Sequence, residues 1–254
     1  MKQENVPQNL TGSCVVILGA GGGIGFEVAS YLASIGAKLL LFTKTHGEDF
    51  LSKVKNLDPD NRYILGVHEL DFENPNSIQE AIRIINGMEN IPNALVVASG
   101  VASGSIFQMT RFADLRQVFD INFFGPLQVV QGIFRQMQKN KKGSIVFISS
   151  VAGMDPKRGN ISYGTSKAAL NFAAQVLSIE AADSNLRVNA VAPGLVNTKM
   201  LGDMNPEAMQ EMLKETSLGR PAESVEIARL IGFLISDMSS HINGQIIRID
   251  GGRK

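Results

Sequence analysis

The chain has 254 residues, 44% of them hydrophobic, and its 24 basic and 24 acidic residues cancel. This length is typical of one large α/β domain, and the neutral balance gives no support to a nucleic-acid-binding protein or to attraction by an anionic membrane. No apolar run approaches the roughly 20 residues of a membrane span, and residues 1–12 lack the apolar core of a signal peptide. The single Cys14 can form no intrachain disulfide, which favours a cytoplasmic protein.

Short apolar runs typical of strands alternate with segments of helical periodicity along the chain. The predicted strands are Val15–Leu18, Leu39–Phe42, Ile64–Leu70, Ala94–Ala98, Ile145–Ser149, Arg187–Val191 and Ile246–Asp250. The predicted helices are Gly25–Ile35, Pro75–Asn86, Arg111–Asn140, Tyr163–Ala182 and Ser224–Ile235. Uninterrupted apolar strands between helices predict an α/β fold: a single doubly wound domain over residues 1–254, with a parallel sheet covered by helices on both faces.

A glycine-rich turn, GAGGGIG at residues 19–25, follows the first strand and leads into the first helix. Glycines let the backbone turn tightly and approach a pyrophosphate, whose charge is then stabilised by the helix N-terminus. The turn therefore predicts a bound dinucleotide. The residues expected to contact it here are Gly19, Gly22, Gly23, Ile24 and Gly25.

The residues after the second and third strands are expected at the adenosine end of the dinucleotide. Thr43 and Lys44 follow the second strand, where no acidic residue stands to bind a ribose 2′-hydroxyl. Lys44 is placed to neutralise a 2′-phosphate, which favours NADP over NAD; a solvated lysine at a strand end is the alternative. Asp71 and Phe72, after the third strand, are placed to meet the adenine edge.

A candidate catalytic set lies downstream of the glycine turn and consists of Ser150, Tyr163 and Lys167. Tyr163 and Lys167 are four residues apart in a helical pattern, so they share one face. A phenol titrates near pH ~10, and an adjacent cation lowers its pKa, which gives a proton donor and acceptor usable near neutral pH. Ser150 would hold a carbonyl or alcohol oxygen. Alone, a Tyr-x-x-x-Lys pair is more often a surface helix pair; the glycine turn favours the catalytic interpretation.

These motifs resemble those of the short-chain dehydrogenases/reductases, and within that family the 3-oxoacyl-(acyl carrier protein) reductases. The likeness runs from about Thr11 to Gly252. The matching stretches, in order, are GAGGGIG (19–25), INFFG (121–125), IVFISSVAG (145–153), SYGTSK (162–167), RVNAVAPGLVNTKM (187–200), LGRPAE (218–223) and INGQIIRIDGG (242–252).

The resemblance implies a seven-stranded parallel Rossmann sheet, a nicotinamide cofactor and, usually, a homotetramer. It implies that Tyr163 is the general acid in ketone reduction, that Lys167 binds the nicotinamide ribose and lowers the tyrosine pKa, and that Ser150 binds the substrate oxygen. Asn122 would hold a water that links Lys167 to solvent. The remaining cofactor contacts implied are Ala98, Gly100, Pro193, Gly194, Val196 and Thr198.

Three stretches depart from the family pattern. Leu18 replaces the usual Thr before the first glycine, and Val97-Ala98-Ser99-Gly100 replaces Asn-Asn-Ala-Gly, so the side-chain hydrogen bonds of two asparagines are lost. Carrier-protein reductases tend to present basic residues near the substrate entrance. Lys139, Lys141 and Lys142 could serve here, but residues 182–185 (ADSN) are poorly basic.

The function expected is NADP(H)-dependent reduction of a ketone to a secondary alcohol, as in fatty acid or polyketide biosynthesis. The expected substrate is a 3-oxoacyl thioester of acyl carrier protein or CoA, under a lid at about residues 199–217 that contains Met200, Met204, Met209 and Met212. A carrier-free ketone or alcohol, such as a steroid, polyol or specialised metabolite, is the alternative, and a non-catalytic nucleotide-sensing relative is a lesser one. No metal, nucleic acid or membrane is expected.

Apolar residues on more than one face of two long helical segments add a physical argument for a homotetramer. They are Phe119, Phe123 and Phe134 in the first segment, and Phe172, Val176 and Ile179 in the second. One sheet can bury only one stripe of a helix, so a second stripe is expected to pack against another subunit.

Overall fold

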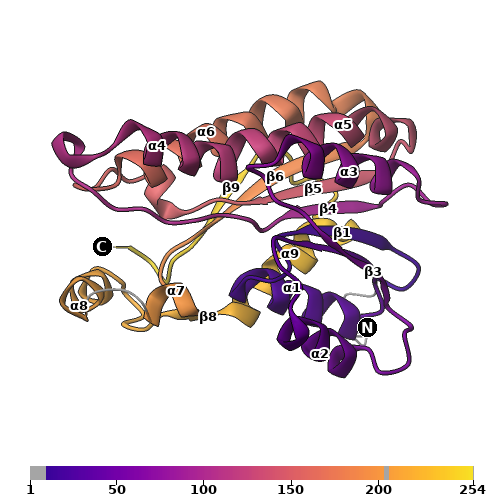
Figure 1. The fold of residues 1–254 in the computed structure, drawn as a ribbon, viewed down its shortest axis with the longest axis horizontal. Helices are drawn as coiled ribbons and strands as arrows, with labels where there is room; N and C mark the ends of the chain where they lie inside the picture. The colour runs from indigo at the N-terminus through magenta and orange to yellow at the C-terminus, as the bar shows by residue number, and fades with distance from the viewer. Residues whose placement is uncertain (1–9, 203–205, 254) are drawn as a thin grey trace, which may run out of the picture.

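The computed structural model describes residues 10–202 and 206–253. Its centre is a seven-stranded sheet in the order β3-β2-β1-β4-β5-β6-β9, with every neighbouring pair parallel (Figure 1). The strands are β1 (Cys14–Leu18), β2 (Lys38–Thr43), β3 (Ile64–Glu69), β4 (Ala94–Val97), β5 (Gly143–Ile148), β6 (Leu186–Pro193) and β9 (Ile246–Ile249). Each overlaps a strand predicted from apolar composition, and the predicted α/β class with a seven-stranded parallel sheet is confirmed.

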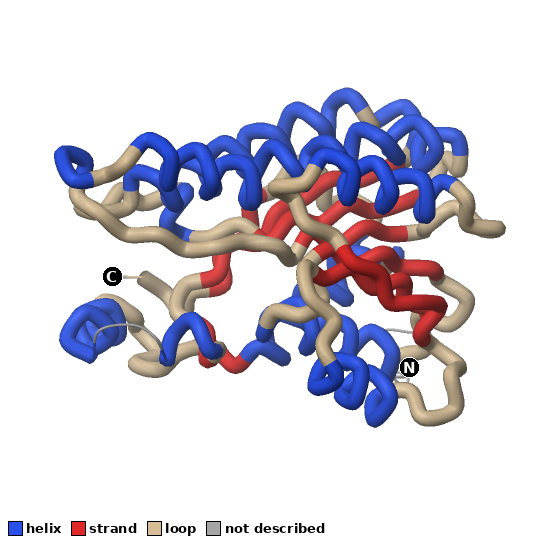
Figure 2. The backbone as a smooth tube through the Cα atoms, viewed as in Figure 1, coloured by secondary structure: helices blue, strands red, loops and turns tan. Residues whose placement is uncertain are grey.

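Helices cover both faces of this sheet (Figure 2). On one face lie α3 (Pro75–Asn86), α4 (Phe112–Phe119), α5 (Gly125–Lys139) and α6 (Ile161–Glu180). On the other face lie α1 (Gly23–Ser34), α2 (Glu48–Leu57) and α9 (Ser224–Ile235). Within residues 10–202 and 206–253, no helix combines the length and the apolarity needed to cross a membrane.

The two layers follow from the alternation of side chains along each strand. In β1, Val15 and Ile17 point into the core shared with α1 and α9, whereas Val16 and Leu18 point into the core shared with α3 and α5. All four are fully buried. Because both faces of the strand are covered, every position must be apolar, which explains the uninterrupted runs in the sequence.

The predicted helix Arg111–Asn140 is divided in the structure. Between α4 and α5 lies a π-helical turn, η2 (Asp120–Phe124). Pro126 has no N–H, so it cannot donate the α-helical hydrogen bond to the Asn122 carbonyl four residues earlier, and a wider turn is favoured. The turn places Asn122 in a fully buried position.

Three helices are not predicted by the apolar pattern. One is α2, which turns a short stripe of Phe50, Val54 and Leu57 to the core. The others, α7 (Lys199–Gly202) and α8 (Pro206–Lys214), lie between β7 (Val196–Asn197) and β8 (Ala222–Glu223). These two short strands pair with each other outside the main sheet.

The strand order has a topological switch point between the neighbouring strands β1 and β4. The chain runs outward from β1 through β2 to β3, then returns to β4 and runs the other way through β5 and β6. At such a switch point the loops that leave the two strands diverge, and their carboxyl ends form the ligand crevice of an open α/β sheet. Gly19 follows β1 and Ser99 follows β4, so both residues lie at this crevice.

Candidate active site

The glycine turn after β1 has no space for side chains at three positions. Gly19 has φ +89°, and a Cβ there would come within 2.6 Å of the Ser99 backbone nitrogen. A Cβ on Gly21 would collide with the Thr43 hydroxyl, and one on Gly25 would collide with the Gly19 carbonyl oxygen. Gly22 is the N-cap residue of α1 and carries no side-chain cap. The turn therefore leaves the first N–H groups of α1 free for an anion, as predicted for a pyrophosphate.

Two features beside this turn fit a dinucleotide. The buried Ser99 hydroxyl has no hydrogen-bond partner among the described residues, although it lies next to Gly19. A Cβ on Gly100 would lie 3.0 Å from Lys167 Nζ and 3.4 Å from Asn122 Oδ1. The space at the end of β4 is thus kept free of side chains, and the Ser99 hydroxyl, which no described residue satisfies, is available to a bound ligand.

Lys44, which is predicted to face a 2′-phosphate, lies in a cluster of opposite charge. Its ammonium is 2.8 Å from Glu73 Oε2 and 3.3 Å from Asp71 Oδ1. Gln117 in α4 donates to the other oxygen of Glu73 at 2.8 Å. The hydrogen bond with Glu73 raises the pKa of Lys44 and lowers the pKa of Glu73. The cation is therefore already compensated by two carboxylates of the same protein.

Phe72, which is predicted to lie near the adenine edge, turns its side chain towards the core. Its side chain packs against the core between the sheet and α3, α5 and α6, and a Cβ on Gly125 would lie 2.6 Å from it. The ring therefore supports the start of α5, and the adenine contact of Phe72 stays a prediction. Asp71 does lie at the crevice, where its carboxylate accepts from the Glu73 N–H at 3.0 Å and faces Lys44.

Ser150 and Tyr163 are brought together from two elements. Ser150 follows β5 and caps the 3-10 turn Val151–Gly153, with its Oγ accepting from the Ala152 N–H at 3.1 Å. Tyr163 lies in the first turn of α6, and its hydroxyl shares a hydrogen bond with Ser150. Two neighbouring hydroxyls at the carboxyl edge of the sheet can together hold one substrate oxygen.

Lys167 lies one turn further along α6 and is almost completely buried. Its ammonium donates to the Ile148 carbonyl at 2.9 Å and stands 5.9 Å from the centre of the Tyr163 ring. Burial lowers the pKa of Lys167 to about 8, against an ordinary value of 10.5. The lysine is still mostly charged at neutral pH, so it places a cation beside the phenol.

The expected lowering of the Tyr163 pKa is not met. Burial raises the pKa of the phenol, and the hydrogen bond with Ser150 only opposes that rise. The physical reason is that Tyr163 and Lys167 are buried together. Desolvation disfavours the charged form of each group, and with 5.9 Å between the ammonium and the ring centre the attraction does not reverse this effect.

Asn122 holds the chain around Lys167. Its side-chain amide donates to the Val101 carbonyl and to Ser166 Oγ, both at 3.0 Å, and its oxygen accepts from the Val101 N–H at 2.8 Å. Ser166 in turn donates to the Tyr163 carbonyl at 2.7 Å. The amide therefore ties η2, the loop after β4 and the catalytic helix together.

The predicted nicotinamide contacts lie along the end of β6 and the segment after it. Pro193 ends the strand, and Gly194 packs against Asp250, to which a Cβ would come within 2.8 Å. Val196 is buried, and Thr198 packs against Gly23 at the start of α1. The structure thus brings Thr198 to the glycine turn.

Three residues of the site are missed by the sequence interpretation. Ser99, Ser166 and Glu73 acquire their places from contacts with residues 29 or more positions away. Ser166 lies inside the recognised SYGTSK stretch, so its position next to Lys167 is a usable signal. Ser99 and Glu73 carry none, because only the sheet order places β1 beside β4 and β2 beside β3.

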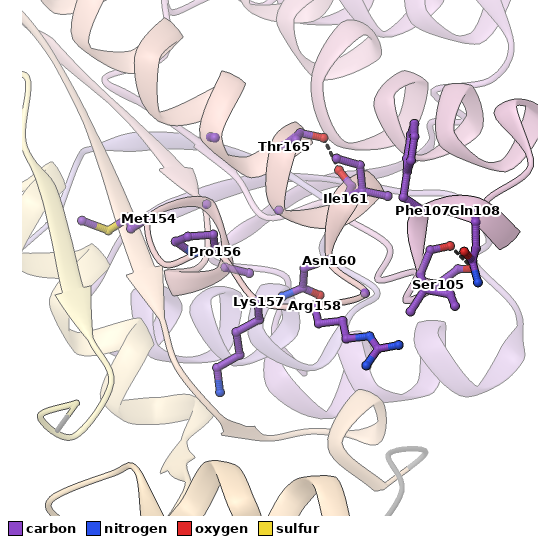
Figure 3. Close-up of a pocket in the computed structure, with 16 residues that line it drawn as sticks. Ser105, Phe107, Gln108, Met154, Pro156, Lys157, Arg158, Asn160, Ile161 and Thr165 are labelled. Atoms are coloured by element: carbon purple, nitrogen blue, oxygen red, sulfur yellow. Dashed lines mark hydrogen bonds between the residues drawn. The ribbon is translucent and has the colours of Figure 1, made fainter.

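A cavity of about 640 Å³ adjoins the catalytic pair (Figure 3). Its lining includes Ala152, whose N–H donates a hydrogen bond to Ser150 Oγ, and Gly164, which follows Tyr163 in the sequence. The other walls come from residues 105–108 after β4, the loop at residues 153–160 and the outer face of α6. Ser150 and Tyr163 do not themselves line the cavity, which begins at the residues next to them.

Comparison with known proteins agrees with this geometry. Residues 19–254 match the family described as Enoyl-(Acyl carrier protein) reductase. The chain belongs to the short-chain dehydrogenase/reductase family. It is therefore an oxidoreductase of the type that uses a nicotinamide cofactor, and the free Ser99 hydroxyl, the narrow glycine turn and the start of α1 fit such a group.

The alignments with relatives cover nearly the whole chain. It is 32% identical over 245 residues to the 3-oxoacyl-(acyl-carrier-protein) reductase FabG of Aquifex aeolicus, covering 96% of this chain and 98% of the relative. It is 31% identical over 241 residues to an acetoacetyl-CoA reductase of an Acinetobacter species, covering 93% and 96%. A solved short-chain type dehydrogenase/reductase from Mycobacterium ulcerans superposes with a TM-score of 0.89 at 26% identity, over 96% of this chain and 90% of that one.

Proposed function

We propose that this short-chain dehydrogenase/reductase reduces the ketone of a 3-oxoacyl thioester to the 3-hydroxy product with NADPH. The observation that carries the proposal is the hydrogen-bonded pair of Ser150 and Tyr163 beside the buried Lys167, in a chain whose full-length relatives include 3-oxoacyl and acetoacetyl-CoA reductases. Direct reduction of a ketone needs one proton donor at the oxygen, and this pair supplies it.

In this mechanism the hydroxyls of Ser150 and Tyr163 donate to the ketone oxygen. A nicotinamide held between the glycine turn and the end of β6 would supply the hydride. Tyr163 transfers its proton to the ketone oxygen as negative charge develops there. The raised pKa of Tyr163 keeps the phenol protonated before the reaction, which suits a general acid. The Lys167 ammonium then stabilises the phenolate that remains.

In this proposal Asn122 is a positioning residue for the chain around Lys167. Its amide is fully engaged with Val101 and Ser166, so it holds the chain around Lys167. Pro126 cannot donate to the Asn122 carbonyl. We assign that carbonyl the water that returns a proton to Lys167 after each turnover.

The proposed cofactor is NADPH, and NADH is the less favoured alternative. No acidic residue follows Phe42 at the end of β2, and Lys44 is the cation nearest to that point in sequence. Glu73 and Asp71 already hold this cation, so a 2′-phosphate would have to share or displace them. The proposal is therefore a moderate preference for NADPH.

The proposed substrate channel runs under residues 199–217 as a lid. Met209 and Met212 lie in α8, whereas Met204 lies outside the described residues. Flexible thioethers suit a channel for an apolar chain. A cytoplasmic location, in which the buried Cys14 thiol stays free, and a homotetramer are part of the same proposal.

A turnover assay tests the function. Purified protein is given acetoacetyl-CoA, or acetoacetyl linked to a bacterial acyl carrier protein, and oxidation of NADPH and of NADH is followed by absorbance. We expect faster oxidation of NADPH with either thioester. No turnover on thioesters alongside clear activity on a free ketone, such as a steroid or a diketone, would overturn the substrate class.

A further inference from the structure

The loop between Ser150 and Tyr163 carries two adjacent cations, Lys157 and Arg158, on the wall of the cavity beside the catalytic pair. In Figure 3 the Lys157 side chain runs downward and the Arg158 side chain runs to the right, both on the side away from Thr165. The lining also includes the apolar side chains of Ile106, Phe107 and Ile161. The cavity thus has both apolar and cationic lining, which matches a ligand that joins an apolar chain to an anion.

Only one of the two cations is free for a ligand. Lys157 Nζ lies 2.6 Å from Glu215 Oε2, so its charge is compensated. The Arg158 guanidinium makes no hydrogen bond or ion pair with any residue in the described ranges 10–202 and 206–253. An exposed arginine with five unused donors on a cavity wall is a ready partner for an anion.

Ion pairs and a backbone hydrogen bond hold the loop in place before and after Arg158. Asp155 is held by Arg248 and Arg253, each at 2.7 Å. On the other side, the Gly159 carbonyl accepts from the Ser105 N–H at 2.9 Å. The Lys157–Glu215 pair ties the loop to the end of the segment 199–217. Arg158 is therefore held on the wall of the cavity, in the loop that joins Ser150 to Tyr163.

From this geometry we propose that Arg158 binds the phosphate at the outer end of a pantetheine arm, while the acyl group lies at Ser150 and Tyr163. The planar guanidinium matches a phosphate in a bidentate manner. CoA esters and carrier-protein esters share this phosphate, so both would be recognised. The assignment rests on the proposed function, and it makes Arg158 the residue that selects carrier-bound ketones over free ones.

The test compares two substrates with the same pantetheine arm: the CoA ester carries the phosphate together with the rest of the 3′-phospho-ADP group, and the pantetheine ester carries neither. Steady-state KM is measured for acetoacetyl-CoA and for acetoacetyl-pantetheine, which has the same arm without a phosphate. In wild-type protein we expect a lower KM for the CoA ester. In Arg158→Gln the KM of the CoA ester should rise about tenfold relative to the KM of the pantetheine ester. This is the loss typical of one charge-assisted contact in a solvated site. Arg158→Lys should recover part of the difference.

A binding measurement complements the kinetics. Phosphopantetheine and pantetheine are compared as competitive inhibitors of acetoacetyl-pantetheine reduction, and Arg158→Gln should weaken only the advantage of the phosphorylated compound. Arg62→Gln is the matched control, because Arg62 is exposed and lies next to the edge strand β3, outside the cavity. Acetoacetyl carrier protein, assayed in the same variants, should respond like the CoA ester.

The outcomes separate this inference from the proposed function. If the wild-type protein turns over neither thioester, the proposed function fails and the assignment of Arg158 falls with it. If both thioesters are reduced and Arg158→Gln leaves the KM ratio unchanged, the function stands and the Arg158 assignment is wrong. Free acetoacetate is assayed in the same two proteins. If Arg158→Gln raises the KM of free acetoacetate alone, the anion bound by Arg158 is a carboxylate and the phosphate assignment is wrong.

Discussion

At the scale of single residues, Tyr163 is the group on which proton transfer depends. Tyr163→Phe keeps the buried ring and removes the transferable proton, so turnover should fall by about 10²–10⁴ while the cofactor still binds. Stopped-flow absorbance gives the turnover, and quenching of NADPH fluorescence gives the binding. Tyr63→Phe is the control, because Tyr63 packs against the core beside β2 and β3. Turnover near the wild-type rate in Tyr163→Phe would refute the mechanism.

Lys167 gives a prediction about pH. Its pKa is about 8 in the folded chain, against an ordinary 10.5, so folding carries the cost of a buried ammonium below pH 8. Between pH 8 and 10.5 the unfolded chain binds more protons than the folded chain, so this cost is relieved as pH rises. The free energy of unfolding of wild-type protein, relative to Lys167→Met, should increase by about 1 kcal/mol from pH 7 to pH 9.

Urea unfolding at pH 7, 8 and 9 measures this difference. Parallel pH dependences of the two proteins would show that the lysine pKa is not depressed. The same variant should lose turnover about as severely as Tyr163→Phe, and it should also bind the cofactor more weakly.

The cluster around Lys44 predicts how cofactor preference can be changed. Lys44→Ala should reduce the preference for NADPH over NADH by about tenfold, because it removes the cation proposed for the 2′-phosphate. Glu73→Gln should increase the preference by about two- to fivefold, because an exposed carboxylate no longer competes for that cation. The ratio of kcat/KM values for the two cofactors and their dissociation constants are the measurements. An unchanged ratio in both variants would exclude Lys44 from the cofactor site.

At the scale of elements, the turn between β1 and α1 is the most constrained connection in the site. Gly19→Ala would force an alanine to φ +89° and bring its Cβ within 2.6 Å of the Ser99 backbone. We expect it to abolish cofactor binding and to lower thermal stability, since β1 and β4 would have to separate. Gly47→Ala is the control, because Gly47 has φ −61° with nothing within 4 Å of its Cβ position. Normal NADPH binding by Gly19→Ala would contradict the role of this turn.

The helices show where local patterns succeed and where they do not. Asn74 caps α3 by accepting from the Asn76 N–H, and Pro75 occupies the first turn, so this helix begins where its sequence predicts. The run from Arg111 to Asn140 has continuous periodicity, yet Pro126 and the packing of Gly125 against Phe72 divide it. The position of Pro126 was visible in the sequence, but the close contact with Phe72 was not.

At the scale of the whole molecule, α6 presents an apolar stripe to solvent. Phe172 and Ile179 are 68% and 77% exposed, and Val176 lies between them on the same face. Phe134 and Phe123, which were grouped with these residues by sequence, pack against the core instead. The α6 stripe is large enough to need a partner, and a second copy of this chain in a homotetramer is the partner proposed.

A double variant tests this proposal. Phe172→Glu combined with Ile179→Glu should dissociate the assembly, because burying two carboxylates in an apolar contact is costly. Light scattering at micromolar concentration gives the molar mass. Leu51→Glu, on the exposed side of α2, is the control and should leave the mass unchanged. A wild-type monomer at that concentration would contradict the tetramer.

By itself, the sequence determined the strands, the glycine turn and the order of the catalytic residues. These features depend on local chemistry: buried strands must be apolar on both sides, a turn at φ +89° requires glycine, and Tyr163 and Lys167 share a helix face through their spacing. What only the tertiary structure decided are contacts between distant segments. Glu73 reaches Lys44, Phe72 supports α5, and Glu215 holds Lys157 while Arg158 stays free. Charge and burial at these positions depend on which elements pack together, and no local pattern in a single chain specifies that.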